Sequence, residues 1–271
     1  MSGKVYLVGA GPGDPELLTV KALRLIQSAD AVLHDDLVAP AILKLIPSAA
    51  RLQNVGKRCG AKTMRQEEIN FLLVNLAHSG LQVVRLKSGD PLIFGRAGEE
   101  MEALRRANVE YEIVPGVTSA LGAAAAAGIP LTHRQAASTL VLTTGHRASG
   151  AAEEWSRHAA GDSTLVIYMP GDNYTEMARK LEDSGFAADT PCAIVSRATT
   201  SEQQIHQTTI SDLHGVARLA APTLLIVGKV VSLGNQKDLY PQSLSHIHNG
   251  LESIFQQFVI SAEKTQEDLS A

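Results

Sequence analysis

Short apolar runs alternate with amphipathic stretches through the first half of the chain. Helical spacing is clearest over residues 65–79, where Ile69, Leu72, Leu73 and Leu76 share one stripe. Apolar runs predict strands at residues 4–8, 31–34, 51–55, 82–86 and 111–114. This alternation predicts a mostly parallel sheet with helices on its faces.

Apolar runs lie closer together in the second half. They predict strands at residues 139–143, 164–169, 193–196, 204–210 and 223–231. Because the run 204–210 alternates at period two, we expect a mixed sheet with at least one antiparallel pair. The sequence Val114-Pro-Gly-Val117 would end any regular element. We therefore expect two α/β domains, residues 1–114 and 118–235, followed by a tail, residues 236–271.

Two other apolar segments have distinct patterns. Residues 113–131 carry no charge but contain Pro115 and Pro130, which favours a tightly packed interior helix over a membrane span. In the tail, one face of a predicted amphipathic helix carries Leu251, Ile254, Phe255, Phe258 and Val259. Such a helix needs a partner surface, on its own subunit or on another.

Composition narrows the class of protein. The chain has 271 residues, of which 45% are hydrophobic, and a formal net charge of −4, so nothing draws it generally to nucleic acid or to an anionic membrane. Its two cysteines, Cys59 and Cys192, lie far apart in the sequence, which favours a reducing compartment without structural disulfides. An apolar strand begins within four residues of the N-terminus, so we expect no signal peptide and a cytoplasmic location.

A glycine-rich turn, Gly9-Ala-Gly-Pro-Gly-Asp-Pro15, joins the first predicted strand to an amphipathic stretch, residues 16–29. Such a turn is typical of nucleotide-type ligand sites. However, its glycine spacing is not that of the dinucleotide fingerprint, and Pro12 lacks an N–H donor. Asp14 adds a carboxylate where a pyrophosphate would lie. The turn therefore favours a ligand that is neutral or cationic at this point.

Two more loops of small residues follow predicted strands. One contains Ser88-Gly-Asp-Pro91, and the other contains Thr118 and Ser119. Each also has a plain structural interpretation, with Asp90 as a helix N-cap before Pro91 and the Thr118 loop as a domain hinge before a capped helix. Because ligands of such sheets gather at the carboxyl ends of the strands, the three loops together predict one shared site.

Six motifs resemble, in the same order, those of the uroporphyrinogen-III C-methyltransferases, within the S-adenosylmethionine-dependent tetrapyrrole methyltransferase family. They are GAGPGDPELLT (9–19), ADAVLHDDLV (29–38), VGKRCG (55–60), LKSGDPLIFGRAGEE (86–100), VPGVTSALGAAAAAGIPLTHR (114–134) and VGKVV (227–231). Two positions depart from the family pattern: Ser88 replaces a glycine and Lys229 replaces a glutamate. The resemblance implies the tetrapyrrole methylase fold, with the cofactor in a cleft between the domains.

The resemblance also implies a reaction and a ligand set. The methyl donor would be S-adenosylmethionine, which leaves as S-adenosylhomocysteine, and no metal is implied. The substrate would be uroporphyrinogen III, methylated at carbons 2 and 7 to give precorrin-2 for siroheme or cobalamin biosynthesis. The implied cofactor-binding residues are Pro12, Ser88, Gly89, Asp90, Ile93, Thr118, Ser119, Met169, Ala198 and Thr223.

Two residues match positions to which the family assigns catalytic roles. Asp35 would be the general base that takes the proton leaving the ring, and Lys57 would be the proton donor. Both have alternative interpretations, Asp35 as the N-cap of a helix over residues 37–45 and Lys57 as a solvated surface lysine. His246 and His248 stand two apart in the tail, and we interpret this spacing as incidental rather than metal-binding.

The substrate carries several carboxylates, so basic side chains should surround it. Arg58, Arg134 and Arg147 lie in loops near the predicted site and are the candidates. The family is typically dimeric, and we expect a homodimer. Two other classes of function stay open: a ligand-sensing protein on the same fold, and a nucleotide-dependent oxidoreductase.

Overall fold

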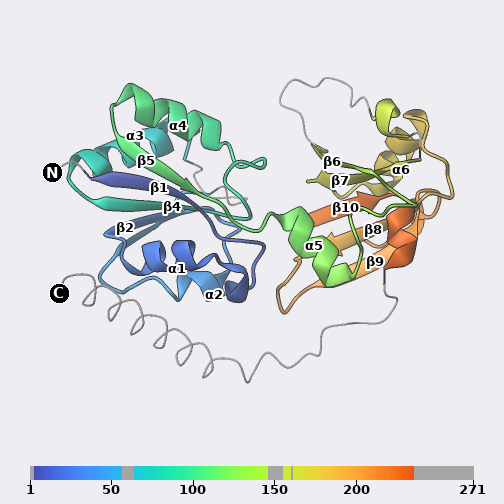
Figure 1. Ribbon diagram of the computed structural model, residues 1–271, viewed down its shortest axis with the longest axis horizontal. Helices are drawn as coiled ribbons and strands as arrows, with labels where there is room; N and C mark the ends of the chain where they lie inside the picture. Colours follow the sequence, from blue (N-terminus) through green and yellow to red (C-terminus); the bar gives the residue numbers. More distant parts are fainter. Residues whose placement is uncertain (1–2, 57–63, 146–154, 160, 235–271) are drawn as a thin grey trace. The chain divides into compact units, whose positions relative to one another are not determined.

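Five strands form the N-terminal sheet of the computed structural model, which describes residues 3–56, 64–145, 155–159 and 161–234 (Figure 1). Their order is β3-β2-β4-β1-β5, and every neighbouring pair is parallel. The strands are β1 (Lys4–Gly9), β2 (Ala31–His34), β3 (Arg51–Asn54), β4 (Gln82–Lys87) and β5 (Glu110–Val114). The predicted strands and their parallel arrangement are confirmed.

Helices cover both faces of this sheet (Figure 1). On one face, Ile26 and Ile42 pack against Val32. On the other, Leu73 and Leu104 belong to the same buried apolar cluster as Leu33. The first face carries α1 (Val20–Gln27) and α2 (Pro40–Leu43), and the second carries α3 (Gln66–His78) and α4 (Ala97–Arg106).

The amphipathic stretch over residues 16–29 is not one helix. Its start is a 3₁₀ turn, η1 (Pro15–Leu17), and α1 begins only after Thr19. The Thr19 hydroxyl accepts a hydrogen bond from Ala22 N at 3.1 Å and so caps α1.

The C-terminal sheet is mixed, as predicted. Its order is β6-β7-β10-β8-β9, with β6 and β7 parallel and the other three pairs antiparallel. The strands are β6 (Thr139–Thr144), β7 (Ser163–Tyr168), β8 (Pro191–Ser196), β9 (Gln204–Thr209) and β10 (Thr223–Val227). The predicted strand 223–231 is too long, because Gly228, with φ of 140°, ends β10 and a 3₁₀ helix, η4 (Lys229–Leu233), follows.

Two apolar layers enclose the C-terminal sheet. One lies under α5 (Ser119–Ala127) and η4, where Ala123 and Val230 pack against Ile226. The other lies under α6 (Tyr174–Asp183), where Leu181 packs against Ile194. Two short 3₁₀ helices, η2 (Ser156–His158) and η3 (Leu213–Gly215), complete the described elements.

Within the uncharged segment, residues 119–127 form α5 and most of their side chains are buried, as predicted, although Leu121 is 52% exposed. Alanines such as Ala120, Ala123 and Ala127 are buried. Among the described residues, no helix is both long and apolar enough to cross a membrane. Residues 1–236 form one compact unit. The predicted amphipathic helix of the tail lies outside the described residues.

Candidate functional site: three loops beside a buried charged cluster

Three loops meet at the carboxyl edge of the N-terminal sheet, and we call this meeting point the three-loop junction (residues 9–15, 88–96 and 114–119). The first two loops are joined by a reciprocal pair of backbone hydrogen bonds. Gly11 N donates to Gly89 O at 3.1 Å, and Gly89 N donates to Gly11 O at 2.8 Å. The sequence placed these loops at one edge, and the structure confirms that they touch.

Glycine is required where the backbones approach most closely. A Cβ atom on Gly9 would lie 2.5 Å from Gly116 N and 2.7 Å from Gly89 O, closer than real Cβ atoms come. Gly9 therefore brings the first loop against both of the others. The small residues of the motifs thus have a structural reason here, which is contact between backbones.

Asp90 ties the second loop to the third. Its Oδ1 accepts a hydrogen bond from Leu92 N at 2.8 Å, and its Oδ2 accepts one from Gly116 N at 3.1 Å. The interpretation of Asp90 as a helix N-cap is wrong, because α4 begins only at Ala97. A carboxylate has about four acceptor positions, so Asp90 keeps acceptor capacity for a ligand.

Tyr168, at the end of β7, takes over the cap of α5. Thr118 is the N-cap residue of α5 but its side chain accepts no capping hydrogen bond. Instead, the Tyr168 hydroxyl accepts from Ala120 N at 3.1 Å and lies 2.5 Å from Thr118 Oγ1. Burial raises the pKa of this hydroxyl, so it stays neutral.

The Tyr168 ring also contacts the second loop. Its centroid lies 4.9 Å from that of Phe94, in a tilted arrangement. Phe94 has a φ of 52°, a left-handed conformation that is rare for an aromatic residue. One side chain of the C-terminal sheet thus holds two loops of the junction at once.

The remaining predicted cofactor residues lie at one edge of the C-terminal sheet. Met169 follows β7, Ala198 follows β8, and Thr223 begins β10, opposite Ser196. This edge touches the first loop, because Asp14 N donates to Thr199 Oγ1 at 3.2 Å. The structure therefore brings these residues to the same side of their sheet.

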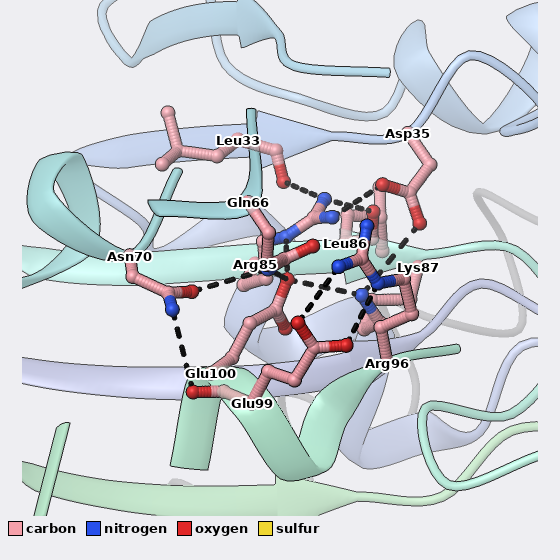
Figure 2. A network of polar contacts seen from close by, with 10 residues as sticks. All are labelled: Leu33, Asp35, Gln66, Asn70, Arg85, Leu86, Lys87, Arg96, Glu99 and Glu100. Atoms are coloured by element: carbon pink, nitrogen blue, oxygen red, sulfur yellow. Dashed lines mark hydrogen bonds and ion pairs between the residues drawn. The ribbon is translucent and has the colours of Figure 1, made fainter. Parts of the chain in front are cut away.

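A charged cluster lies under the same edge of the N-terminal sheet (Figure 2). It consists of Asp35, Arg85, Lys87 and Glu100, and Figure 2 shows their side chains converging. Arg85 and Lys87 alternate along β4, so both point to the face that α3 and α4 cover. Arg85 is 2% exposed and Glu100 0%, whereas the Asp35 side chain is 28% exposed. Asp35 is thus the member of the cluster that reaches solvent.

Hydrogen bonds fix the geometry of this charged cluster. Glu100 Oε1 accepts from Arg85 Nε at 2.9 Å, from Lys87 Nζ at 3.1 Å and from Gln66 Nε2 at 3.3 Å. Arg85 Nη2 donates to Asp35 Oδ1, and Lys87 Nζ lies 3.8 Å from Asp35 Oδ2. The two cations and two anions balance, which is what burial of charge requires.

Burial affects the two cations differently. Burial lowers the pKa of Lys87 below its usual value, and the positive charge of Arg85 adds to this effect. Burial acts on the pKa of Arg85 in the same direction, but the charges of Asp35 and Glu100 outweigh it and raise that pKa. Arg85 is therefore the permanently charged centre of the cluster.

The interpretation of Asp35 as a helix N-cap is wrong. The helix α2 begins at Pro40, and its N-cap residue is Ala39. Asp35 instead lies directly after β2, where its own N–H donates to Leu86 O at 3.1 Å. The Asp35 carboxylate accepts a hydrogen bond from Arg85 and caps no helix. It is therefore a candidate for a catalytic role.

Four predicted residues are not assembled by the described structure. Lys57, Arg58 and Arg147 lie outside the described residues, as does Cys59. Arg134 is exposed in the turn after α5 and makes no hydrogen bond or ion pair with the described part of the chain. Its predicted contact with substrate therefore stays a prediction.

Arg85, Lys87, Glu100 and Tyr168 are not predicted as site residues by the sequence. A signal for the first two was present, because two cations at alternate positions of an apolar strand must share one face of a buried sheet. Glu100 could have been found as a carboxylate on the buried stripe of a helix. The hydrogen bond from Ala120 N to the Tyr168 hydroxyl joins residues 48 positions apart, and no local sequence pattern predicts it.

The described residues contain no group of three histidine, cysteine, aspartate or glutamate side chains that could hold a metal ion. Two α/β domains with glycine-rich loops at the carboxyl ends of their strands are typical of proteins that bind a ligand at that edge. Residues 4–214 match the model of the tetrapyrrole (corrin/porphyrin) methylases. The chain belongs to this family.

Similar proteins include a siroheme synthase of Yersinia enterocolitica, which is 50% identical over 86% of this chain and 50% of the relative. A uroporphyrinogen-III C-methyltransferase of Paracoccus denitrificans is 49% identical over 89% of this chain and 86% of its own length. The chain therefore spans about half the length of the siroheme synthases it matches.

A solved structure of the same family has a similar fold. Uroporphyrin-III C-methyltransferase of Thermus thermophilus, complexed with S-adenyl homocysteine, superposes with a TM-score of 0.75 at 40% identity, over 85% of this chain and all of that chain. The predicted fold class, two α/β domains of the tetrapyrrole methylase type, is confirmed.

Proposed function

We propose that this chain transfers methyl groups from S-adenosylmethionine to carbons 2 and 7 of uroporphyrinogen III, giving precorrin-2. The observation that carries the proposal is the 49% identity to a uroporphyrinogen-III C-methyltransferase over 86% of that protein. The fold also supports the proposed activity, because the Thermus thermophilus relative that is complexed with S-adenyl homocysteine has the same fold. We propose the three-loop junction as the corresponding site in this chain.

The junction residues suit this cofactor. Its sulfur is cationic and its amino acid end is zwitterionic, so Pro12, which offers no N–H, and the carboxylate of Asp90 are compatible with it. Ser88, Gly89, Ile93, Thr118 and Ser119 lie in the second and third loops, while Met169, Ala198 and Thr223 would bind from the C-terminal sheet. We place the cofactor in the cleft between the two domains on these grounds.

In this reaction a pyrrole carbon attacks the methyl group, and the carbon–sulfur bond breaks with its electron pair going to sulfur. A ring proton must then leave, and Asp35 is the base that we assign to it. Asp35 suits the role because its carboxylate reaches solvent from a fixed position beside Arg85. Lys57 would act as the proton donor, and Arg58, Arg134 and Arg147 would bind the carboxylates of the ring.

An anaerobic assay tests the proposal. We expect incubation with uroporphyrinogen III and S-adenosylmethionine to add two methyl groups to the ring, counted by mass. Calorimetric titration should show binding of S-adenosylhomocysteine and none of NAD, which would exclude an oxidoreductase. Binding of S-adenosylhomocysteine without any methylation would favour the ligand-sensing alternative.

The pathway and the assembly are also proposals. The siroheme synthases among the relatives favour siroheme as the destination of the product, with cobalamin as the second. We propose a cytoplasmic homodimer that binds neither nucleic acid nor membrane, on the basis of composition and of the predicted tail helix. Sedimentation at micromolar concentration should show the dimer, and a monomer there would refute it.

A further inference from the structure

Arg85 is fixed more completely than a structural ion pair requires. Its side chain is 2% exposed, and each of its three nitrogens donates. Nε donates to Glu100, Nη1 lies 3.4 Å from both Leu33 O and Leu86 O, and Nη2 donates to Asp35. A planar guanidinium held on three sides has a single orientation.

The acceptors of Arg85 come from different elements. Leu33 and Asp35 belong to β2 and the residue after it, Leu86 belongs to β4, and Glu100 belongs to α4. Leu33 and Leu7 are also the register partners of Arg85 in the neighbouring strands. Arg85 is therefore at the centre of the sheet, and its orientation fixes where the Asp35 carboxylate lies.

We infer that Arg85 is a positioning residue for Asp35, with Glu100 holding the Arg85 guanidinium in place from behind. The inference deepens the proposed function, because it rests on Asp35 being the general base. Glu100 is completely buried and accepts three hydrogen bonds on Oε1 alone, so it serves the two cations and does not reach substrate. Misplacing a reacting group by about 1 Å can cost about 10²-fold in rate.

Arg85→Lys tests this inference, since it keeps the charge but removes the planar fork. An ammonium can reach Glu100 or Asp35 but cannot satisfy both together with the two backbone carbonyls. We expect kcat to fall about tenfold or more, while the dissociation constant for S-adenosylhomocysteine changes less than about twofold. Unchanged kcat in this variant would overturn the inference.

A double-mutant cycle separates positioning from general structural damage. If Arg85 acts through Asp35, Arg85→Lys in the Asp35→Asn background should cost less than about threefold further. A loss that multiplies fully with that of Asp35→Asn would contradict the inference. The matched control is Arg106→Lys on the exposed side of α4, where Arg106 pairs with Glu102, and it should leave kcat unchanged.

If Arg85→Lys does not fold, Arg85→Met combined with Glu100→Gln replaces it in the same cycle. This pair removes one positive and one negative charge, so it leaves the net charge of the cluster unchanged with either aspartate or asparagine at position 35. We expect the same lack of further loss in the Asp35→Asn background.

A spectroscopic measurement keeps the inference separate from the proposed function. The carboxyl ¹³C resonance of Asp35, assigned by its absence in Asp35→Asn, should move in Arg85→Lys and stay in place in Arg106→Lys. If the wild-type chain methylates nothing but this resonance moves, the proposed function falls and the positioning role stands. If the resonance does not move, the positioning role falls whatever the activity.

Discussion

The two sheets of this chain bury different kinds of side chain. Under the N-terminal sheet lie Arg85, Lys87 and Glu100, each at most 2% exposed. The described part of the C-terminal sheet buries only small polar side chains, Thr164 and Ser196. Its core is otherwise apolar, with residues such as Ile194 and Leu225 at 0% exposure.

This difference suggests that the N-terminal sheet carries the chemistry and the C-terminal sheet helps to bind the ligand. Burying ionised groups has a high cost in free energy that only pairing offsets, so a cluster of four charges at one edge indicates chemistry there. The C-terminal sheet instead offers backbone and hydroxyl groups at its edge, which suit holding a ligand. The comparison predicts that substitutions in the N-terminal cluster affect turnover, while substitutions at the C-terminal edge affect binding of the cofactor.

The largest effect is expected at Asp35. Asp35→Asn should lower the turnover number by roughly 10²–10⁴-fold, because the amide cannot accept the ring proton. Binding of S-adenosylhomocysteine, measured by calorimetry, should be unchanged. Asp183→Asn is the control, because Asp183 pairs with Arg179 on the exposed side of α6, and it should leave the turnover number unchanged. Near-normal methylation by Asp35→Asn would end its assignment as the base.

The next effect tests whether the core of the C-terminal sheet tolerates charge. Burial raises the pKa of Cys192 in β8 to about 12, from a usual value of 9.0. Above pH 9 the unfolded chain loses the thiol proton while the folded chain keeps it, so the unfolded state binds fewer protons and stability falls.

Between pH 9 and 10.5, the unfolding free energy of the wild type should fall by about 1.6 kcal/mol more than that of Cys192→Ala. Denaturant unfolding in the presence of a reductant measures both. Parallel pH profiles for the two proteins would show that this core accommodates a thiolate.

A smaller effect is expected for the arginines assigned to the substrate. Replacing Arg134 by glutamine should raise the Michaelis constant for uroporphyrinogen III by roughly tenfold, through loss of one charge-assisted hydrogen bond. The same holds for Arg58 and Arg147. Arg106→Gln serves as the control, because Arg106 lies on the exposed side of α4. If all three substitutions leave the constant unchanged, the ring carboxylates are bound elsewhere.

The smallest effect is expected at Tyr168, on the binding side of the comparison. Tyr168→Phe removes the contacts with Ala120 N and Thr118 Oγ1, and we expect the loosened loop to cost the bound ligand about 1 kcal/mol in total. Affinity for S-adenosylhomocysteine should fall about fivefold, with little change in turnover at saturation. Tyr111→Phe, which removes a surface contact with Arg105, should leave the affinity unchanged. A loss confined to turnover in Tyr168→Phe would place this residue with the chemistry instead.

The sequence predicted the strands well, because most of them are apolar runs of ordinary strand length, although β3 (RLQN) and β9 (QIHQTT) are mainly polar. It also predicted that three loops would meet, since parallel strands bring their carboxyl ends to one edge. The sequence did not predict the backbone conformation where tertiary contacts determine it. Phe94 and Arg96 have positive φ values, so the chain after Asp90 turns twice before α4 begins.

The candidate site was predicted in part for the same reason. Motifs identified Asp35 and Asp90, but their partners depend on pairing between distant elements. Arg85 and Asp35 are 50 positions apart, and Arg85 and Glu100 are 15 apart. Hydrophobic periodicity records which face a residue lies on, and it does not record which buried charges meet on that face.

The position of the bound cofactor decides whether the three-loop junction is the methyl-donor site. A crystal structure of this chain with S-adenosylhomocysteine should show the ligand touching Pro12, the loop 88–93 and Thr118–Ser119. Its sulfur should face the side on which Asp35 reaches solvent. A ligand bound with no contact to these three loops would contradict the account.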